Sequence, residues 1–343
     1  MNVTKILAVA LGWIICVPLF ADEIRLLTWE EYFSSELISE FEQQTGHTLK
    51  QVYFESEALR DQVVYSGKAK AYDLFIIDGY TLQQLSEEGV LSRVDRSLAE
   101  GNFSKDSVAA CKDYGVPYSF GSIGIGYRGS KVDKTFNSWM DVFDYAKENP
   151  NTVVMPDEDL DTAGIALMAL GYHPMSTSEN ELKEAYQLLD GVVGSLLAFR
   201  NTLGYAMDKG ADSSMNVSVF YSGEKEQISI ATNQDDWEYV IPTEGTLMWY
   251  ECFSSHVDRP INEATRSFLN FINKPQNAIN NAQSIWFATT NSKALKLAES
   301  DYLKDSELFP KVTEKTKNYS YDVIDEKSQQ IRANIINILS SDK

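Results

Sequence analysis

Short apolar segments alternate with amphipathic segments from residue 22 onward, and this alternation constrains the fold more than any other feature of the chain. It predicts strands at 24–28, 49–54 and 72–78, and helices at 34–45, 58–66 and 81–88. Residues 72–78 read YDLFIID, a continuous apolar run typical of a parallel strand that is covered on both faces. Strand–helix–strand repetition of this kind predicts an α/β layer with right-handed crossovers.

A long predicted strand separates this first set from a second one. Residues 114–127 (YGVPYSFGSIGIGY) are rich in glycine and in β-forming residues, as suits a strand that crosses between two lobes. The predicted elements after it are helices at 162–170 and 179–189, a strand at 228–232, and C-terminal helices at 262–272 and 327–339. The chain shows no internal repeat and no low-complexity linker, so we expect two lobes of intertwined chain rather than two domains in series.

The first 21 residues have the features of a secretory signal peptide. Lys5 precedes an apolar run at 6–17, and Pro18 and Leu-Phe-Ala at 19–21 follow it. The run is too short for a membrane span of ~20 residues. An uncleaved lipoprotein anchor at Cys16 is the alternative, although Ile15 precedes it where such sites generally have a small residue. Cleavage after Ala21 leaves 322 of the 343 residues and removes one lysine, so the net charge of −20 becomes −21.

The charge balance restricts the partners of the chain. It has 50 Asp+Glu against 30 Lys+Arg, and its hydrophobic content of 43% excludes a disordered acidic chain. A polyanionic surface repels phosphate, which argues against nucleic acid and against an anionic membrane surface. A cationic ligand is what this balance attracts.

Sequence motifs give no support for a cofactor or a metal. Residues 124–129 match G-x-G-x-x-G, but a turn-like stretch follows where a dinucleotide site needs a helix. Asp157, Asp159 and Asp161 alternate as in an EF-hand, yet the positions that require Gly and Glu hold Thr162 and Met168. We therefore expect no cofactor and no metal, and the acids at 157–161 are also explained by the start of a helix.

No catalytic constellation is evident either. The three histidines, His47, His173 and His256, share no metal-ligand spacing, and neither G-x-S-x-G nor H-E-x-x-H occurs. We expect a protein without enzymatic activity. A secreted hydrolase that uses paired carboxylates as acid and base is the alternative.

Cys111 and Cys252 are the cysteines that remain after processing. An oxidising compartment permits a disulfide between them. Two separate buried thiols are equally compatible with the sequence, since neither cysteine lies in a C-x-x-C motif.

Aromatic and acidic residues occur together at predicted strand ends. The three groups are Trp29-Glu30-Glu31-Tyr32, Asp78-Gly79-Tyr80 and Trp249-Tyr250-Glu251. Ligands of open α/β sheets lie beyond the carboxyl ends of the strands, and the first two groups fall there. A buried ammonium needs carboxylates or the face of an aromatic ring, and rings also cover the methylenes between charges. Together these groups indicate a site for a slender oligocation.

At these residues the chain resembles the periplasmic spermidine/putrescine-binding proteins, a branch of the extracellular solute-binding proteins that includes norspermidine-sensing relatives. The resemblance covers nearly the whole mature chain. It is carried by LLTWEEYFSSELISEFEQQTG (26–46), VYFESEAL (52–59), YDLFIIDGYTLQQLSEEGVL (72–91), YGVPYSFGSIGIGYRGSKV (114–132), NSWMDVFDY (137–145) and IPTEGTLMWYECFSS (241–255).

The resemblance implies a two-lobed periplasmic-binding-protein fold of the α/β class, with hinge strands and a ligand cleft between the lobes. Residues 22–126 and 252–296 would form lobe I, and residues 127–251 and 297–343 would form lobe II. The implied function is a periplasmic polyamine-binding protein, a monomer that closes on its ligand and passes it to an ABC permease in the inner membrane. The alternative is a periplasmic polyamine sensor that signals to a membrane-bound cyclic-di-GMP enzyme controlling biofilm.

The resemblance also implies a set of ligand-binding residues. The first lobe would supply an aromatic and acidic wall, and the second lobe would supply two acids. A tryptophan would stack on the aliphatic chain of the ligand, and a further acid, Glu251, would grip an amine. The implied set is Trp29, Glu31, Tyr32, Asp78, Tyr80, Glu158, Asp161, Tyr221, Trp249, Glu251 and Phe287. Relatives also use a residue from the last fifty, which we could not align around 318–322. On the same template Cys111 and Cys252 approach one another near the hinge.

Several positions differ from the pattern of the family. Asp78 stands where relatives carry Ser, and Glu30 where they often carry Thr, so we expect more negative charge in the pocket. Glu158 and Glu251 replace Asp, Asp161 replaces Glu, and Phe287 lacks the hydroxyl of a family Tyr. These changes leave open which polyamine is preferred.

Overall fold

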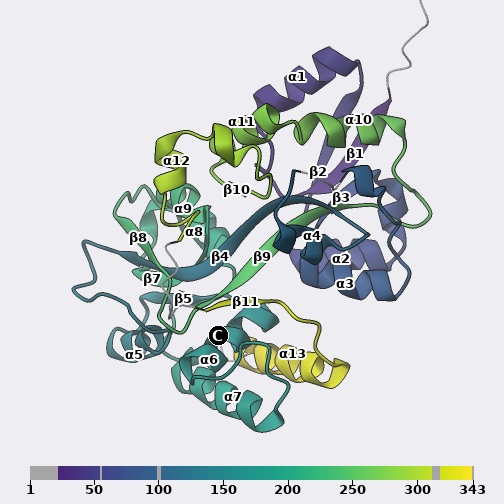
Figure 1. Ribbon diagram of the computed structural model, residues 1–343. Helices are drawn as coiled ribbons and strands as arrows, with labels where there is room; N and C mark the ends of the chain where they lie inside the picture. The colour runs from purple at the N-terminus through teal and green to yellow at the C-terminus, as the bar shows by residue number, and fades with distance from the viewer. Residues whose placement is uncertain (1–21, 55, 99–101, 311–316, 342–343) are drawn as a thin grey trace, which may run out of the picture.

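The computed structural model describes residues 22–54, 56–98, 102–310 and 317–341. The predicted signal peptide lies outside these residues. Eleven strands form one sheet with the order β2-β1-β3-β9-β4-β7-β5-β6, to which β10 and β8 add along β4 and β11 along β9 (Figure 1). The predicted α/β class is confirmed. None of the helices in the described part of the chain combines the length and the apolar character that crossing a membrane requires.

The first parallel set follows the prediction closely. Its elements are β1 (Glu23–Thr28), α1 (Ser35–Thr45), β2 (Thr48–Tyr53), α2 (Glu57–Tyr65), β3 (Leu74–Asp78) and α3 (Gly79–Glu87). The side chain of Ser34 accepts a hydrogen bond from the N–H of Leu37 at the start of α1, and Gly46 ends the helix at a φ of 75°. A serine N-cap and a left-handed glycine are ordinary helix boundaries, which is why this helix was predictable from local sequence.

The second parallel set has its strands in the same spatial order as the first set. Its elements are α5 (Met140–Glu148), β5 (Val153–Met155), α6 (Asp159–Ala169), α7 (Glu179–Val193), β6 (Ala198–Phe199), α8 (Thr202–Lys209), β7 (Val217–Tyr221), α9 (Glu224–Thr232) and β8 (Trp237–Val240). In each set the first strand lies between the second and the third, as β1 does between β2 and β3 and β5 between β6 and β7.

Two long antiparallel strands join the sets. They are β4 (Val116–Arg128) and β9 (Thr246–Ser254), which run side by side through the centre of Figure 1. The end of β9 pairs with β3 along one edge, most of β9 pairs with the first half of β4 along the other edge, and the second half of β4 pairs with β7. The chain therefore crosses from one parallel set to the other along β4 and returns along β9.

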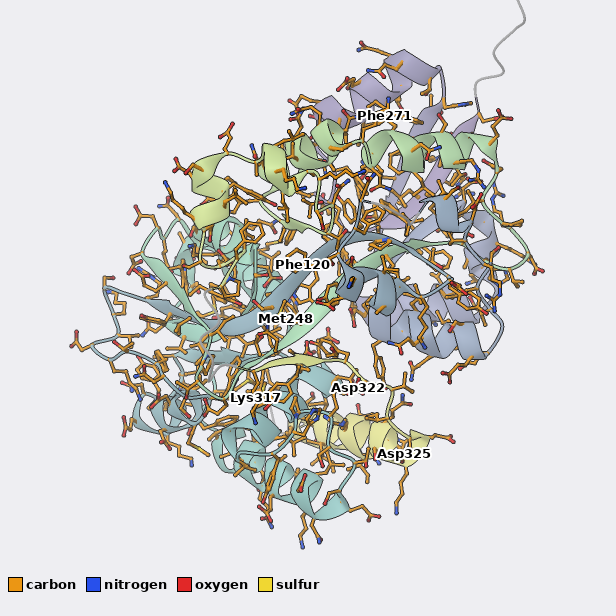
Figure 2. The ribbon with its side chains drawn as sticks, in the orientation of Figure 1. Phe120, Met248, Phe271, Lys317, Asp322 and Asp325 are labelled. Atoms are coloured by element: carbon orange, nitrogen blue, oxygen red, sulfur yellow. A yellow bond between two sulfur atoms is a disulfide. The ribbon has the colours of Figure 1, made fainter. Side chains whose placement is uncertain are left out.

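The remaining elements cover the edges and complete the sheet. The helices are α4 (Lys105–Cys111), α10 (Glu263–Ile272), α11 (Pro275–Ile285), α12 (Ser300–Lys304) and α13 (Glu326–Ser341); the short strands are β10 (Ala288–Thr289) and β11 (Asn318–Ser320); and the 3₁₀ turns are Lys68–Ala71, Arg96–Leu98, Gly210–Asp212 and Leu295–Leu297. Figure 2 labels Lys317 and Asp322 on either side of β11, which pairs with β9 so that Ser320 faces Met248.

The strand predicted at 228–232 is wrong, because these residues form the end of α9. The segment Ile-Ser-Ile-Ala-Thr alternates apolar and polar residues as a strand does. Ile228 and Thr232 are buried, whereas Ile230 is 73% exposed. Burial thus follows the four-residue spacing of a helix, and the period of two in the sequence is incidental.

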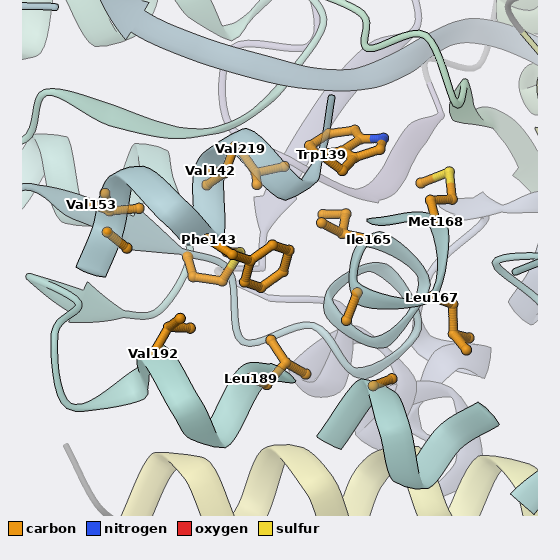
Figure 3. Packing of buried hydrophobic residues seen from close by; sticks show 14 of the residues in the cluster. Trp139, Val142, Phe143, Val153, Ile165, Leu167, Met168, Leu189, Val192 and Val219 are labelled. Atoms are coloured by element: carbon orange, nitrogen blue, oxygen red, sulfur yellow. The ribbon is translucent and has the colours of Figure 1, made fainter. Parts of the chain in front are cut away.

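Separate hydrophobic clusters support the two sets of elements. Around the second set, Trp139 and Phe143 from the α5 region pack against Ile165 of α6, Leu189 of α7 and Val219 of β7 (Figure 3). The last helix joins this cluster, since Ile335, Ile336 and Leu339 of α13 belong to it. Other clusters hold the first set, with β1, β3 and the helices α1 and α10 in one of them.

A disulfide joins Cys111, the last residue of α4, to Cys252 of β9. Both cysteines are fully buried. Of the two alternatives that the sequence allowed, the structure contains the bridge. It ties α4 to the strand position next to Glu251.

Candidate functional site

Four groups of candidate residues stand at the carboxyl ends of parallel strands, two groups in each set. Trp29 follows β1 and Asp78 ends β3, while Glu158 follows β5 and Tyr221 ends β7. The crossing strands β4 and β9 lie between the two sets. Ligand sites of open α/β sheets lie beyond these strand ends, where the strand order reverses. The topology therefore places the candidate site beside the crossing strands.

Glu251 of β9 is the central acid on the side of the first set. It faces Asp78 of β3 across the antiparallel pair, and only 5% of it is exposed. The indole Nε1 of Trp29 donates a hydrogen bond of 3.3 Å to Glu251 Oε1, while Oε2 is buried with no hydrogen-bond partner among the described residues. Burial raises the pKa of Glu251 to about 8, and the nearby Arg60 opposes that shift.

Arg60 of α2 is a site residue that the sequence did not indicate. Its guanidinium is fully buried. Nη2 donates to Asp78 Oδ2 at 2.7 Å, Nε donates to Asp61 Oδ1 at 2.8 Å, and Nη1 lies 3.8 Å from Glu57 Oε1. The negative charge that we expected Asp78 to add is thus paired with a cation from a neighbouring helix.

Glu57 is the first residue of α2, and its carboxylate lies near Asp78. Burial, and next the charge of Asp78, raise its pKa well above the usual value of a glutamate. Its side chain nevertheless keeps 41% of its surface exposed. The charges of Glu158 and Glu251 add to the raised pKa of Glu57, so Glu57 lies near the acids of both groups.

A second acidic group begins α6. Glu158 is the N-cap residue and Asp161 lies in the first turn, so the helix N-terminus favours the negative charge there. Burial, and then the charge of Asp161, raise the pKa of Glu158 to about 7. Asp161 is buried and accepts hydrogen bonds from the hydroxyls of Tyr221 and Tyr321, one on each oxygen. Both predicted acids therefore lie together.

Tyr321 comes from the C-terminal segment in which we expected a contributor that could not be aligned. It follows β11, and the pairing of β11 with β9 brings it to Asp161, 160 residues away along the chain. Asp161 also raises the pKa of Tyr321, after the larger effect of burial.

A row of aromatic rings connects the two sides. Ring centroids are 4.4 Å apart for Trp29 and Phe54, 6.5 Å for Trp29 and Tyr32, 5.3 Å for Tyr32 and Phe287, and 6.2 Å for Phe287 and Trp249. Gly121 on β4 faces Trp249 on β9, and any side chain larger than hydrogen at this glycine would collide with the indole. The predicted rings Trp29, Tyr32, Phe287 and Trp249 are thus neighbours.

Glu224 is a further acid that the sequence analysis missed. It accepts a hydrogen bond of 3.1 Å from the N–H of Tyr221, and its charge contributes to the raised pKa of Tyr32. Burial raises the pKa of Glu224 to about 8, and the nearby Glu307 adds to the shift. An acid three residues after Tyr221, at the start of α9, was the sequence signal for this position.

Two other predicted residues have different surroundings. Tyr80 of α3 packs into the hydrophobic cluster of the second set, and its hydroxyl accepts a hydrogen bond from Gln329 of α13. It therefore contacts the opposite part of the fold. Glu31 lies exposed in the loop after β1 with a φ of 61°.

The geometry suits recognition of an elongated cation. Carboxylates from both sets can accept hydrogen bonds from ammonium groups, and the rings between them can cover methylenes or contact a cation through their faces. Within the described ranges, no group of three or more His, Cys, Asp or Glu side chains has an arrangement that could hold a metal ion.

Comparison with known families agrees with this architecture. The family model of bacterial extracellular solute-binding proteins matches residues 36–311. The chain belongs to this family. As a member of a solute-binding family it is expected to bind its ligand rather than convert it, and the predicted periplasmic-binding-protein fold is confirmed by solved structures.

Relatives of this family member include both transport and sensory proteins. The norspermidine sensor of Vibrio cholerae is 25% identical over 295 residues, which cover 86% of this chain and 82% of that protein. The spermidine/putrescine-binding periplasmic protein of Escherichia coli is 26% identical over 291 residues, which cover 82% of this chain and 81% of that protein. Among solved structures, a putative spermidine/putrescine ABC transporter protein from Listeria monocytogenes superposes with a TM-score of 0.82 at 25% identity, covering 94% of this chain and 99% of that one.

Proposed function

We propose that this solute-binding protein binds polyamines in the periplasm and closes around them. The observation that carries the proposal is the arrangement of two acidic groups, around Glu251 and around Asp161, with the row of rings from Trp29 to Trp249 between them. The names of the relatives support the same ligand class.

In the proposed complex each acidic group holds one ammonium. Glu251 Oε2 accepts a hydrogen bond from the amine on the side of the first set, since this oxygen is buried with no partner in the described part of the chain. Glu158 and Asp161 hold the amine on the other side, where the hydroxyls of Tyr221 and Tyr321 orient Asp161. Trp249 and Tyr32 cover the methylenes, because an aromatic face accommodates both an aliphatic chain and a cation.

We assign residues 22–126 and 252–296 to lobe I and residues 127–251 and 297–343 to lobe II. The strands β4 and β9 act as the hinge. Tyr302 and Leu308 pack with Ala278 and Ala282 of α11, so the segment after 297 also rests on lobe I. Glu251 is the last residue of the first lobe II range and pairs with Asp78 of lobe I, so it lies at the hinge, whereas Glu158 and Asp161 belong to lobe II. Ligand contacts that exist only in the closed form favour closure.

Calorimetry tests the proposal directly. The mature chain is titrated at moderate ionic strength with putrescine, spermidine, norspermidine and spermine. We expect saturable binding of at least one of them at one site, and it should persist when salt is raised, because surface attraction is screened and a desolvated site is not. Heat signals that disappear with salt for all four ligands would contradict a polyamine site.

Polyamine affinity should rise between pH 6 and pH 8. The pKa values of about 7 for Glu158 and about 8 for Glu224 and Glu251 mean that protons compete with the ammonium groups in this range. Primary amines stay charged there, as the lysine value of about 10.4 indicates. Each proton released on binding changes the affinity by roughly tenfold per pH unit. Titrations at pH 7 in buffers with different ionisation enthalpies measure the proton release, and identical heats in all buffers would exclude it.

Replacing Trp249 with Ala should weaken the binding of long polyamines more than that of putrescine. Trp249 ends the row of rings that begins at Trp29, so a ligand amine held beside Trp29 and Glu251 must be followed by a long chain before that chain reaches the indole of Trp249. A cation–π contact is worth about 0.5–2 kcal/mol. The Trp249→Phe variant keeps a ring and serves as the control. An equal loss for all ligands in calorimetry would argue against stacking along the chain.

We propose delivery of the ligand to an ABC transporter as the first function and polyamine sensing as the second. The similarity to the norspermidine sensor of Vibrio cholerae over 86% of this chain favours the second candidate. Neighbouring genes distinguish them: permease and ATPase genes support transport, whereas a membrane protein with cyclase or phosphodiesterase modules supports signalling through cyclic-di-GMP.

A further inference from the structure

Arg60 is a positive charge inside a site that is built for cations. The guanidinium is fully buried beneath α2, and it bonds Asp61 of its own helix and Asp78 at the end of β3. Its Nη2 also donates to the hydroxyl of Thr81 at 3.2 Å. Such a buried arginine is held by interactions from two elements, α2 and the β3–α3 junction, and is fixed in place.

Arg60 forms an ion pair with Asp78, an acid that would otherwise be available to the ligand. Asp78 Oδ1 accepts a hydrogen bond from the N–H of Thr81 at 2.8 Å, and Oδ2 accepts the bond from Arg60. Asp78 is also the partner of Glu251 in the β3–β9 pair. Arg60 is therefore adjacent to the carboxylate to which we assign the amine of the ligand.

We propose that Arg60 is a specificity-determining residue, an internal cation that pairs with Asp78 and thereby limits the number of ammonium groups that the site favours. The inference rests on the proposed polyamine function. In it, the ion pair of Arg60 and Asp78 behaves as a neutral unit, so Glu251 and Glu57 remain as the acids on this side for the ligand.

The physical consequence is a dependence on ligand charge. Removing Arg60 alone adds one negative charge to the site, which favours every polyamine but favours the tetracation spermine more than the dication putrescine. Removing Asp78 alone takes one negative charge from the site and has the opposite effect. Removing both residues restores the original charge.

The experiment is a charge cycle measured by calorimetry on the mature chain. We compare the ratio of putrescine Kd to spermine Kd in the Arg60→Met, Asp78→Ser and Arg60→Met/Asp78→Ser variants, and in Arg60→Lys, which keeps the charge. Serine is a good helix N-cap, so Asp78→Ser preserves the start of α3. The double variant removes both Arg60 and Asp78, so neither is left buried without the other. It can therefore be measured even if Arg60→Met does not fold.

We expect the ratio to rise about tenfold in Arg60→Met, to fall about tenfold in Asp78→Ser, and to stay within about threefold of the original in the double variant and in Arg60→Lys. The control is Arg266→Gln on α10, which removes the same charge from an exposed ion pair between Arg266 and Asp95. A similar shift in Arg266→Gln, or an unchanged ratio in both single variants that still bind polyamines, would overturn the inference. A mature chain that binds neither putrescine nor spermine would instead overturn the proposed function, and the inference with it.

Discussion

The Glu251→Gln variant is expected to bind polyamines more weakly by about 2–5 kcal/mol, the range for removing one partner of a buried charge pair. Glu251 is 5% exposed, and one of its oxygens has no hydrogen-bond partner among the described residues. The amide keeps the shape of the carboxylate and can still accept a bond from Trp29. It cannot neutralise an ammonium, so the ligand charge would be buried without compensation.

The same variant should also reduce the effect of pH on binding. Burial raises the pKa of Glu251 to about 8, so part of the binding energy at neutral pH is used to release its proton. A glutamine has no proton to release. The loss in affinity should therefore be larger at pH 8 than at pH 6, because only the original carboxylate gains charge over that interval.

Glu238→Gln provides the matched control for this experiment. It removes a carboxylate from an exposed position on β8, so the overall charge changes equally while the site does not. Calorimetry with the polyamine that binds most tightly gives the comparison, and thermal unfolding confirms that both variants fold. Equal affinities for Glu251→Gln and the original protein would remove Glu251 from the site.

Local sequence was sufficient for the first parallel set and for the residues at strand ends. Continuous apolar segments such as 72–78 and capped helices such as α1 depend on nearest neighbours, so they could be predicted within a few residues. Because the carboxyl ends of parallel strands mark ligand sites, Trp29 and Asp78 were identifiable as candidates before their partners were known.

The remaining parts of the site depend on contacts between distant segments. Tyr321 reaches Asp161 across 160 residues, and Arg60 on an amphipathic helix gives no local sign of lying under Asp78. Glu224 looked like an ordinary acid at the start of a segment that we had predicted to lead into a strand at 228–232. We missed Glu224 because we predicted a strand where the chain forms α9. The helix begins at Glu224, and this start brings its carboxylate to the N–H of Tyr221.

Removing the disulfide should lower the free energy of unfolding by about 2–5 kcal/mol, the usual cost for a native bridge. Cys111 and Cys252 are separated by 141 residues, so the bridge closes a long loop and greatly restricts the unfolded chain. The Cys111→Ala/Cys252→Ala variant is compared with the oxidised protein by urea unfolding. The denaturant slope should increase in the variant, because an unfolded chain without the bridge exposes more surface.

Polyamine binding distinguishes a purely stabilising bridge from one that also positions the site. Cys252 follows Glu251 on β9, and the bridge anchors this part of the strand to α4. If the bridge acts only on the unfolded state, the alanine variant keeps its affinity under conditions in which it is fully folded. A loss of affinity in the folded variant would mean that the bridge also holds Glu251 in position.

Two further measurements test the bridge itself. Two titratable thiols in the denatured mature protein without reductant would contradict the disulfide. An unchanged free energy of unfolding in the alanine variant would contradict its stabilising role.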